Sequence, residues 1–310
     1  MIKTQVCVLI PTLNEEAGIA QVLSQIPKKT LGMIVTPVVV DGNSTDATVK
    51  IARAKGAKVI IQQTKGKGSA IAEALEQINS EYLVMADGDG TYDLTRLDEM
   101  VKPLMDGKAD MTVATRIEDS DAGAITAFNK IGNFAFNRLI SFFYGKKITD
   151  MLTGYRALKT EKLRDLNLVT KNFEYETEIT IEALRNNYRI LEFPLHYSLR
   201  LGKTKLHPLR DGMRIMKTLT LMVRDTVPLF FFGTLSLAFL LFSLWPVSLV
   251  LYEKLSTGSV QHLSSAILAA FSIIVGLQLF LTGMLADSNL QNTKRLENLI
   301  KREGKKKKVE

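Results

Sequence analysis

Short apolar runs alternate with stretches of helical periodicity over residues 1–115. The runs are rich in Val and Ile and have no polar alternation, which is typical of strands buried on both faces of a parallel sheet. The stretches between them have the spacing of amphipathic helices. This pattern predicts an α/β fold whose ligands bind at the carboxyl ends of the strands. The predicted strands are "QVCVLIP", "IVTPVVVD", "AKVIIQQ", "EYLVMAD" and "ADMTVATR".

Residues 120–206 have a mixed pattern. The stretches "ITAFNKIGNFAFNRLISFFYG" and "FEYETEITIEALRNNY" predict amphipathic helices, and "RILEFPLHY" predicts a strand. Residues 207–226 predict a helix with a basic and an apolar side, which is typical of a helix lying in a membrane interface. Its basic side holds Arg210, Arg214, Lys217 and Arg224, and its other side holds Met213, Met216, Thr220 and Val223.

Two long uncharged segments occupy most of residues 227–287. They run from about 227 to 252 and from about 263 to 286, and neither contains a charged residue. A helix needs about 20 apolar residues to span a bilayer. The segments therefore predict two transmembrane helices, and a buried helical hairpin of a soluble protein is the alternative.

Positive charge gathers beside these segments. The chain carries a net charge of +8, while residues 200–224 hold seven Lys or Arg against Asp211 and residues 294–310 hold eight against three Glu. Anionic headgroups attract such flanks, so the charge indicates a membrane and not nucleic acid. By the positive-inside rule both flanks face the cytosol, including the basic tail at 288–310. The single cysteine, Cys7, excludes a disulfide framework.

The stretch "ADGDGTYD" places three carboxylates on one turn after a predicted strand. An EF-hand loop needs Gly at its sixth position and Glu at its twelfth, where this chain has Tyr92 and Asp98. A plain surface turn is an alternative, since Asp and Gly favour turns. The third interpretation is a divalent-cation site, because Asp87 and Asp89 would repel each other without a cation between them. Mg²⁺ or Mn²⁺ held by one or two carboxylates keeps positions open for substrate phosphates.

A metal that holds phosphates indicates a nucleotide substrate. The stretch "KGKGS" at 65–69 is not a P-loop, because Ile61 stands where that motif needs its first Gly. Lys65 and Lys67 would either lie near a phosphate or be ordinary solvated lysines. The few histidines and the lone cysteine match neither a catalytic triad nor a zinc site.

Six motifs follow one another along the chain: "PTLNE", "VDGNSTDAT", "GKGSA", "ADGDGTYD", "TGYRALK" and "RLGKTKL". Their order resembles that of the family 2 nucleotide-diphospho-sugar glycosyltransferases, which have a GT-A fold. With the membrane hairpin, the chain resembles in particular the dolichyl-phosphate or polyprenyl-phosphate sugar synthases. The resemblance implies an enzyme with a GT-A domain over residues 1–206, Mg²⁺ or Mn²⁺ as cofactor, and a nucleotide sugar and a polyprenyl (dolichyl) phosphate as substrates. Trp245 lies in a membrane segment, not in the Q-x-x-R-W motif of processive polysaccharide synthases, which favours transfer of one sugar.

The resemblance also implies roles for individual residues. The nucleotide-sugar pocket would be formed by Pro11, Leu13, Glu15, Asp41, Lys67, Asp87, Gly88 and Asp89. The metal would be held by Asp87 and Asp89, with Thr91 as a weaker third ligand. Phosphate groups in the catalytic centre would be bound by Arg116, Arg200 and Lys205. Purely structural roles remain open for Pro11, Asp41 and Arg200.

The reaction that fits these residues needs no histidine. A phosphate monoester is largely a dianion at pH 7, because its second pKa is near 6. A lipid phosphate can therefore attack without a general base, and the metal and the basic residues would offset its repulsion from the donor diphosphate. We expect one in-line displacement at the anomeric carbon, with inversion.

Three details favour UDP-GlcNAc or UDP-glucose as the donor over GDP-mannose. The "GKGSA" loop resembles the corresponding loop of the glucosyl-type synthases. Thr91 stands where mannosyl members often have glutamine, and Leu13 stands where they have tyrosine. We expect a multi-pass membrane enzyme with its catalytic domain and both termini in the cytosol, feeding protein or cell-surface glycosylation. A catalytically idle GT-A-like membrane adaptor is the alternative. The sequence leaves open a homo-oligomer and the choice of dolichyl or undecaprenyl acceptor.

Overall fold

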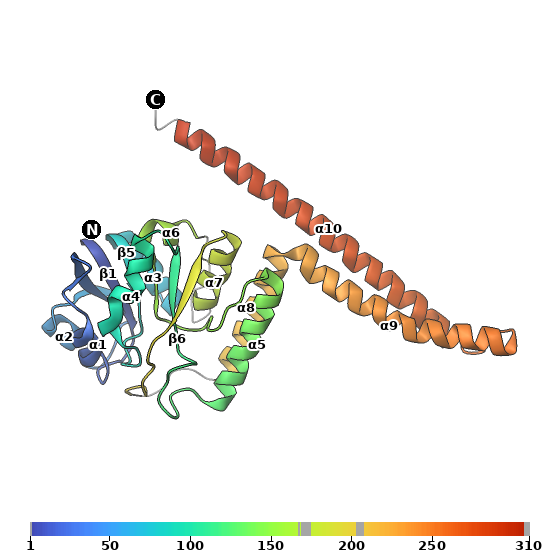
Figure 1. Cartoon of the computed structure of the whole chain (residues 1–310), viewed down its shortest axis with the longest axis horizontal. Coiled ribbons are helices and arrows are strands. Elements are labelled where there is room, and N and C mark those ends of the chain that lie inside the picture. The colour runs from blue at the N-terminus through green and yellow to red at the C-terminus, as the bar shows by residue number, and fades with distance from the viewer. Residues whose placement is uncertain (1, 167, 169–174, 203–207, 307–310) are drawn as a thin grey trace. The chain divides into compact units, whose positions relative to one another are not determined.

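The computed structural model describes residues 2–166, 168, 175–202 and 208–306 (Figure 1). The chain divides into two compact units, Met1–Leu219 and Thr220–Glu310. The boundary falls inside one helix, α8 (Pro208–Thr226). Lys205, an expected phosphate ligand, lies outside the described residues.

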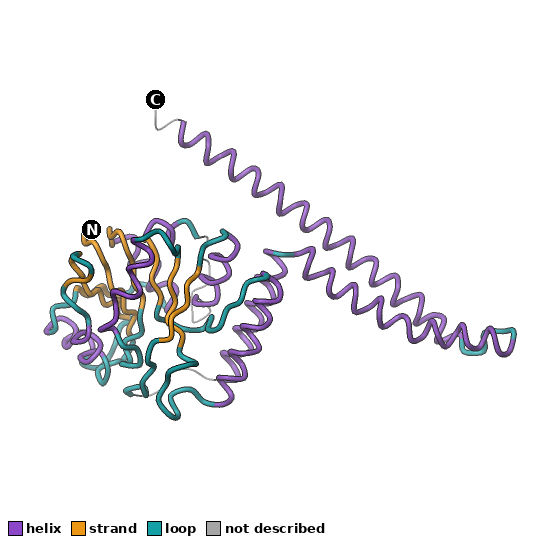
Figure 2. Tube along the Cα trace, viewed as in Figure 1, coloured by secondary structure: helices purple, strands orange, loops and turns teal. Residues whose placement is uncertain are grey.

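The first unit is built on a mixed sheet, whose strands are orange in Figure 2. Within the described residues its strand order is β2-β3-β1-β5-β7-β6-β8, with β4 paired to β3. Strand β1 is parallel to both its neighbours, and the pairs β3–β4 and β6–β8 are also parallel. Strand β7 runs antiparallel to β5 and β6, and β2 antiparallel to β3. The strands are β1 (Ile2–Thr12), β2 (Lys29–Thr30), β3 (Met33–Asp41), β4 (Lys58–Ile61), β5 (Ile78–Met85), β6 (Met111–Thr115), β7 (Arg156–Lys159) and β8 (Ile190–Pro194).

All six predicted strands are present, but the expectation of a parallel sheet is only partly right. Strand β7, within the "TGYRALK" motif, was not predicted as a strand, and it enters the sheet between β5 and β6. The antiparallel pairings at β7 therefore make the sheet mixed.

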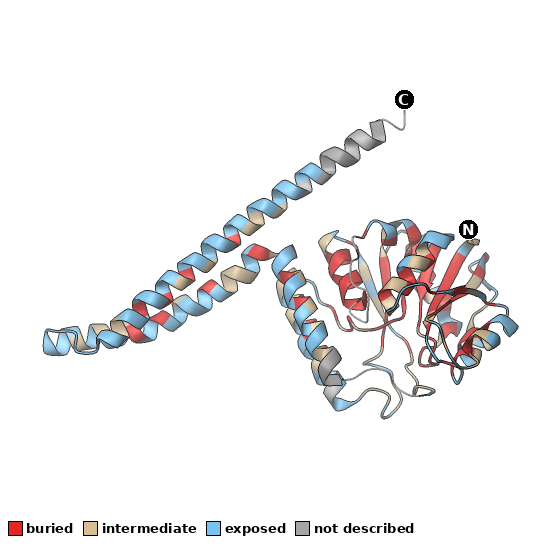
Figure 3. Cartoon of the chain, turned by 180° about the vertical axis from the view of Figure 1, so that it is seen from behind, coloured by how far each residue is buried: buried red, intermediate tan, exposed pale blue. Residues whose placement is uncertain are grey.

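Side chains of β1 alternate between two cores, because successive strand residues face opposite sides of a sheet. Val6, Val8 and Ile10 pack into one hydrophobic cluster, and Cys7 and Leu9 into another. Helices cover both faces, so the strands are buried between them (Figure 3). The first cluster includes residues of α1 (Ile19–Gln25), α2 (Thr48–Ala54) and α4 (Leu97–Met105), the last preceded by the 3₁₀ turn η1 (Leu94–Arg96); the second includes residues of α3 (Lys67–Gln77), α6 (Thr160–Arg164) and α7 (Tyr175–Arg185).

Helix α7 differs from its predicted amphipathic character. Every residue from Tyr175 to Leu184 is buried, including three glutamates. Two of these carboxylates form ion pairs, Glu176 with Lys67 and Glu182 with Arg185. Buried charges are tolerated when they are paired, so the polar positions do not require a solvated face.

The predicted aromatic helix is α5 (Ala127–Tyr144). It begins where the hydroxyl of Thr126 accepts a hydrogen bond from the backbone N–H of Asn129, and it ends at Gly145 in the left-handed conformation. Its outer face leaves Ile131 and Phe134 about 70% exposed. That face is therefore not ordinary core packing.

The second unit contains two long helices, α9 (Pro228–Thr257) and α10 (Leu263–Lys306). Both contain stretches long and apolar enough to cross a membrane by length and composition, at 228–257 and 263–293. Only 17% and 22% of their most apolar windows are buried, which does not fit the buried hairpin of a soluble protein. Helix α10 runs without a break to Lys306, so it includes most of the basic tail at 288–310.

The two long helices pack closely through glycine. The Ser236 hydroxyl of α9 donates a hydrogen bond to the carbonyl of Gly276 in α10, at 2.7 Å. A Cβ atom added at Gly276 would lie 2.9 Å from Leu240 Cδ2, and one at Gly283 would lie 2.9 Å from Phe232 Cβ. Small residues let helix backbones approach in this way.

Replacing Gly276 by leucine is therefore expected to destabilise the hairpin by about 1–3 kcal/mol, because the added side chain overfills the contact. The control is Gly233→Leu in the same hairpin, where an added Cβ meets nothing within 4 Å. Thermal unfolding of the full chain in detergent measures the difference. Equal melting temperatures for the two variants would contradict this packing.

Candidate active site

The candidate residues gather at the carboxyl ends of adjacent parallel strands. The segment Pro11–Glu15 continues from β1, Asp41 ends β3, and Asp87–Thr91 follows β5. Because β3, β1 and β5 are neighbours with the same direction, these segments meet at one edge of the sheet. This is the placement that the sequence predicted.

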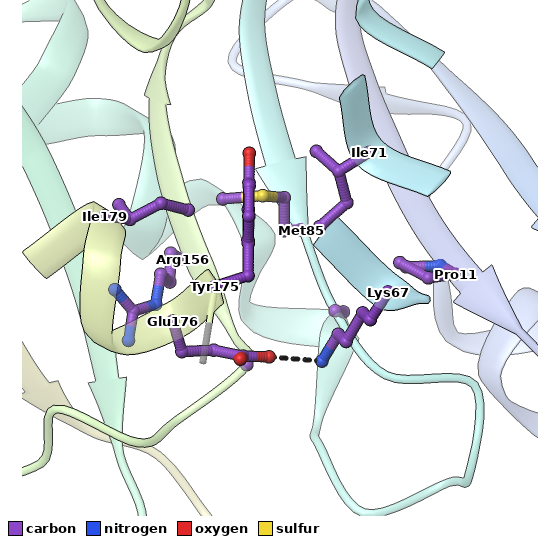
Figure 4. Close-up of a pocket in the computed structure, with 10 residues that line it drawn as sticks. Pro11, Lys67, Ile71, Met85, Arg156, Tyr175, Glu176 and Ile179 are labelled. Carbon is purple, nitrogen blue, oxygen red and sulfur yellow. Dashed lines mark ion pairs between the residues drawn. The ribbon is translucent and has the colours of Figure 1, made fainter. Parts of the chain in front are cut away.

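Asp87 faces a lysine from the neighbouring helix. The Nζ atom of Lys67 lies 2.5 Å from Asp87 Oδ1. It also lies 2.5 Å from Glu176 Oε1, the ion pair drawn as a dashed line in Figure 4. Lys67 is the first residue of α3, and its side chain is only 15% exposed. Lys67 is therefore not a solvated surface lysine, and its second partner, Glu176, was not predicted from the sequence.

Asp89 forms an ion pair with Arg200, which comes from a segment far along the chain from Asp89. Arg200 Nη1 lies 3.1 Å from Asp89 Oδ2, and Arg200 Nη2 lies 2.6 Å from Glu15 Oε1. Within the described residues, the buried Nε of Arg200 has no hydrogen-bond partner. Arg200 thus holds two acidic residues of the site and keeps one donor for an anion.

Thr91 orients Asp89. Both its hydroxyl and its backbone N–H donate to Asp89 Oδ1, at 2.7 and 3.2 Å. A hydroxyl in this position fixes the carboxylate, and its own role as a metal ligand stays a prediction.

The two aspartates have opposite pKa shifts. Burial acts to raise the pKa of Asp87, but the positive charges of Lys67, Arg116 and Arg200 outweigh it, so that pKa is lowered. Burial and the negative charge of Asp87 raise the pKa of Asp89. Burial acts to lower the pKa of Lys67, but Asp87 and Glu176 raise it well above its ordinary value, so the ammonium stays protonated.

The charges of the cluster fit a divalent cation. Four carboxylates form ion pairs with Lys67 and Arg200, and among them Asp87 and Asp89 are close enough to repel each other. Among the described residues, no group of three or more His, Cys, Asp or Glu could hold a metal. A pair of carboxylates suits Mg²⁺ or Mn²⁺, which are bound by one or two carboxylates together with substrate phosphates. The carboxylates are Glu15, Asp87, Asp89 and Glu176.

Glycines let the backbone close around the two aspartates. A Cβ atom at Gly154 would lie 2.6 Å from Asp87 Oδ2, and one at Gly18 would lie 2.7 Å from the carbonyl carbon of Asp89. A Cβ atom at Gly88 would lie 2.8 Å from Thr12 Cγ2. The "TGYR" motif therefore contributes Gly154 to the wall of the site.

The small cavity behind Lys67 is lined by Pro11, Gly154, Arg156 and Glu176, among others (Figure 4). Its volume is about 10 Å³, which is far too small for a sugar. The cavity therefore lies among the residues that surround Lys67. A nucleotide-sugar donor would have to bind on the solvent side of the two aspartates.

The expected nucleotide contacts have different surroundings. Leu13 is 44% exposed beside the site. Asp41 is buried, and its carboxylate accepts hydrogen bonds from the Thr12 hydroxyl at 3.2 Å and from the Ser44 hydroxyl and backbone N–H at 2.5 and 2.7 Å. Asp41 therefore holds the turn after β3, and a contact with ribose stays a prediction.

Arg116 is paired with a residue that the sequence reasoning missed. Its Nε and Nη2 donate to Asp150 Oδ2 and Oδ1 at 2.8 and 2.7 Å, and its guanidinium lies 5.5 Å from the ring centre of Tyr197. Asp150 is fully buried and also accepts from Asn133. The pair positions Arg116 rigidly beside the site.

Arg156 is a second missed residue. It is fully buried, and its guanidinium donates to the carbonyls of Thr153 and Met151 and to the Thr180 hydroxyl. These bonds tie the "TGYR" loop to α7. The only sign of Arg156 in the sequence was its place in the "TGYRALK" motif, since hydrophobic periodicity cannot reveal a buried Arg.

Residues 196–202 form a strip over the aspartate turn. Ser198 N–H donates to the carbonyl of Thr91, and Leu201 N–H donates to the carbonyl of Asp89, at 2.8 and 2.9 Å. The strip is also held at its start, where His196 pairs with Asp119. These bonds place Arg200 against Asp89.

Three kinds of match connect the chain with known proteins. The model of the family described as Glycosyl transferase family 2 matches residues 7–166. Glycosyltransferase AglJ of Haloferax volcanii is 36% identical over 301 residues, which is 95% of this chain and 98% of that protein. A dolichyl-phosphate hexose transferase of the same organism is 37% identical over 212 residues, 68% of this chain and 91% of that protein.

The third match is in structure. Glucosyl-3-phosphoglycerate synthase from Mycobacterium tuberculosis, crystallised with Mn²⁺, UDP and glucosyl-3-phosphoglycerate, gives a TM-score of 0.56 at 22% identity. The match covers 71% of this chain and 80% of that chain. It shows that the first unit has a GT-A-like fold.

Proposed function

The chain belongs to glycosyl transferase family 2, and we propose that it moves one sugar from a nucleotide-diphospho-sugar to dolichyl or another polyprenyl phosphate at the cytosolic face of a membrane. The observation that carries this proposal is the pair Asp87 and Asp89, held between Lys67 and Arg200. The two aspartates repel each other, and they lie at the carboxyl ends of parallel strands, where α/β folds bind their ligands. Similarity to a dolichyl-phosphate hexose transferase supports the acceptor.

Asp87 and Asp89 would hold Mg²⁺ or Mn²⁺. When bound, the cation would neutralise the donor diphosphate and stabilise the leaving nucleoside diphosphate. The glucosyl-3-phosphoglycerate synthase of similar fold was crystallised with Mn²⁺ and UDP, which supports both the cofactor and a UDP-sugar donor. UDP-GlcNAc and UDP-glucose remain the favoured donors, with GDP-mannose next.

The chain's own residues then position the acceptor phosphate. Arg200, whose Nε has no hydrogen-bond partner among the described residues, would donate to that phosphate, and Arg116 would add positive charge nearby. The phosphate oxygen forms a bond to the anomeric carbon while the bond to the donor diphosphate breaks, and the electron pair leaves with the nucleoside diphosphate. A single displacement of this kind inverts the anomeric configuration.

The helices outside the sheet would bring the lipid to the site. We propose that α9 and α10 span the membrane and that α8 lies in its cytosolic interface, where Met213 and Met216 are exposed. Val223, expected on the same apolar side, is buried instead. The exposed Ile131 and Phe134 of α5 would form a wall for the polyprenyl chain.

Transfer of labelled sugar tests the proposal. Membranes containing the full chain are supplied with a polyprenyl phosphate and labelled UDP-GlcNAc, UDP-glucose or GDP-mannose, with Mn²⁺ or with EDTA. We expect label in the lipid from one donor, lost with EDTA. A folded chain that neither transfers label nor binds any of the three donors would instead support the idle adaptor, and a product of retained configuration would overturn the single displacement.

A further inference from the structure

The ammonium group of Lys67 contacts a carboxylate that is proposed to bind the divalent cation. Its ammonium touches Asp87, one of the two carboxylates that would hold the metal, and a second carboxylate on another helix, Glu176. A divalent cation that approaches Asp87 must therefore overcome the repulsion of a positive charge already in contact with it. The site cannot hold both cations on the same carboxylate oxygen.

The local structure allows the lysine to give way. Its four-carbon side chain has several rotatable bonds, and it leaves the first residue of α3 directly after Gly66, whose φ is +106°. Glu176 is fixed in contrast, since it lies in the first turn of the buried helix α7, where the helix dipole favours a carboxylate. A short swing would keep the ammonium on Glu176 while it leaves Asp87.

We propose that Lys67 and the divalent cation exchange at Asp87, and that Glu176 is a positioning residue that retains the lysine ammonium when the cation binds. The inference rests on the proposed function, because it concerns the same cation site. Without cation, Lys67 prevents the repulsion between Asp87 and Asp89. With cation, the ammonium stays on Glu176, near the diphosphate of the donor.

The exchange of Lys67 and the cation at Asp87 can be tested without turnover. Mn²⁺ alone is added to the purified full chain, and electron paramagnetic resonance of the free ion measures how much of it binds. Lys67→Met should bind Mn²⁺ about tenfold more tightly, because even water-like screening of a unit charge a few ångströms from a divalent ion corresponds to about that factor. Glu176→Gln should bind it about tenfold more weakly, since the lysine then has only Asp87 as a partner.

A double-mutant cycle separates positioning from plain charge. If Glu176 acts through Lys67, Glu176→Gln weakens Mn²⁺ binding much less in a Lys67→Met background than in the parent, by about threefold or more. If Glu176 acts only as a nearby negative charge, the two factors are equal, and the proposal is overturned. The double variant also restores the charge balance of the cluster, so it keeps the test valid if a single variant unfolds.

Two matched controls come from the same elements. Lys65→Met removes an exposed lysine two residues away, and Glu182→Gln removes a buried glutamate of α7 that pairs with Arg185. Both should leave Mn²⁺ binding unchanged. If the parent binds no Mn²⁺, the proposed cation site itself fails. If the parent binds Mn²⁺ but Lys67→Met does not bind it more tightly, the site stands and the exchange is wrong.

Discussion

Replacing Asp89 by asparagine is expected to lower sugar transfer by a factor on the order of 10²–10³, the usual cost of removing one electrostatic contact to the charge that develops in a transition state. The asparagine can still accept the hydrogen bonds from Thr91, so the turn is retained. What it loses is the negative charge toward a divalent cation and toward Arg200. Initial rates of lipid labelling, measured at saturating donor, give the factor.

The same turn offers a control, Asp93→Asn. Asp93 accepts from the backbone N–H and the hydroxyl of Thr95 at the start of η1, and asparagine caps a helix about as well as aspartate. Transfer by that variant should stay within about twofold of the parent, since its carboxylate supports only the 3₁₀ turn. A similar loss in both variants would mean that the turn depends on overall charge and not on a cation site at Asp89.

Replacing Arg116 by methionine is expected to destabilise the first unit by about 3–5 kcal/mol, because it leaves the fully buried Asp150 without its partner. The free energy of unfolding, from denaturant titration of the full chain in detergent, measures this loss. The double variant Arg116→Met/Asp150→Asn removes both charges and should recover most of the stability. If Arg116 also attracts a phosphate, transfer stays low in the double variant, whereas full recovery of transfer would make the pair purely structural.

The stability of the pair also depends on pH. Burial acts to raise the pKa of Asp150, but Arg116 and its hydrogen bonds outweigh burial, so the pKa lies below its ordinary value. A carboxyl with a lowered folded pKa contributes stability above its unfolded pKa, and that contribution is lost as the pH falls through the folded pKa. The deficit of Arg116→Met should therefore be full at neutral pH and shrink in acid.

Hydrophobic pattern was sufficient to predict the strands that carry the site. Uninterrupted apolar runs located β1, β3 and β5, and parallel packing then brought Asp41, Asp87 and Asp89 to one edge. The apolar lengths of α9 and α10 were equally readable, since a run of about 20 uncharged residues has few other uses. These features depend on local sequence alone.

Features that depend on partners distant in the chain were missed. The sequence around Glu176 looks amphipathic, and only Lys67, more than a hundred positions away, explains why that glutamate is buried. Strand β7 is short and begins with Arg156, whose burial depends on carbonyls of its own loop and on Thr180. Asp150 carries no sign of its role until Arg116 is seen beside it. Periodicity describes one element at a time, so it cannot reveal such pairs.

If α8 lies in the membrane interface as proposed, the strip of residues 196–202 would limit how far the aspartate turn can move from the membrane. Leu201 is hydrogen-bonded to the backbone of Asp89, and α8 begins at Pro208, seven residues further along. At about 3.5 Å per residue, the segment between Leu201 and Pro208 cannot span more than roughly 25 Å. A bilayer that holds the start of α8 would thus keep the carboxylates of the candidate site within reach of a phosphate at the level of the lipid headgroups. Inserting residues between Leu201 and Pro208 would let the candidate site move away from the lipid phosphate while every residue of the site stays unchanged.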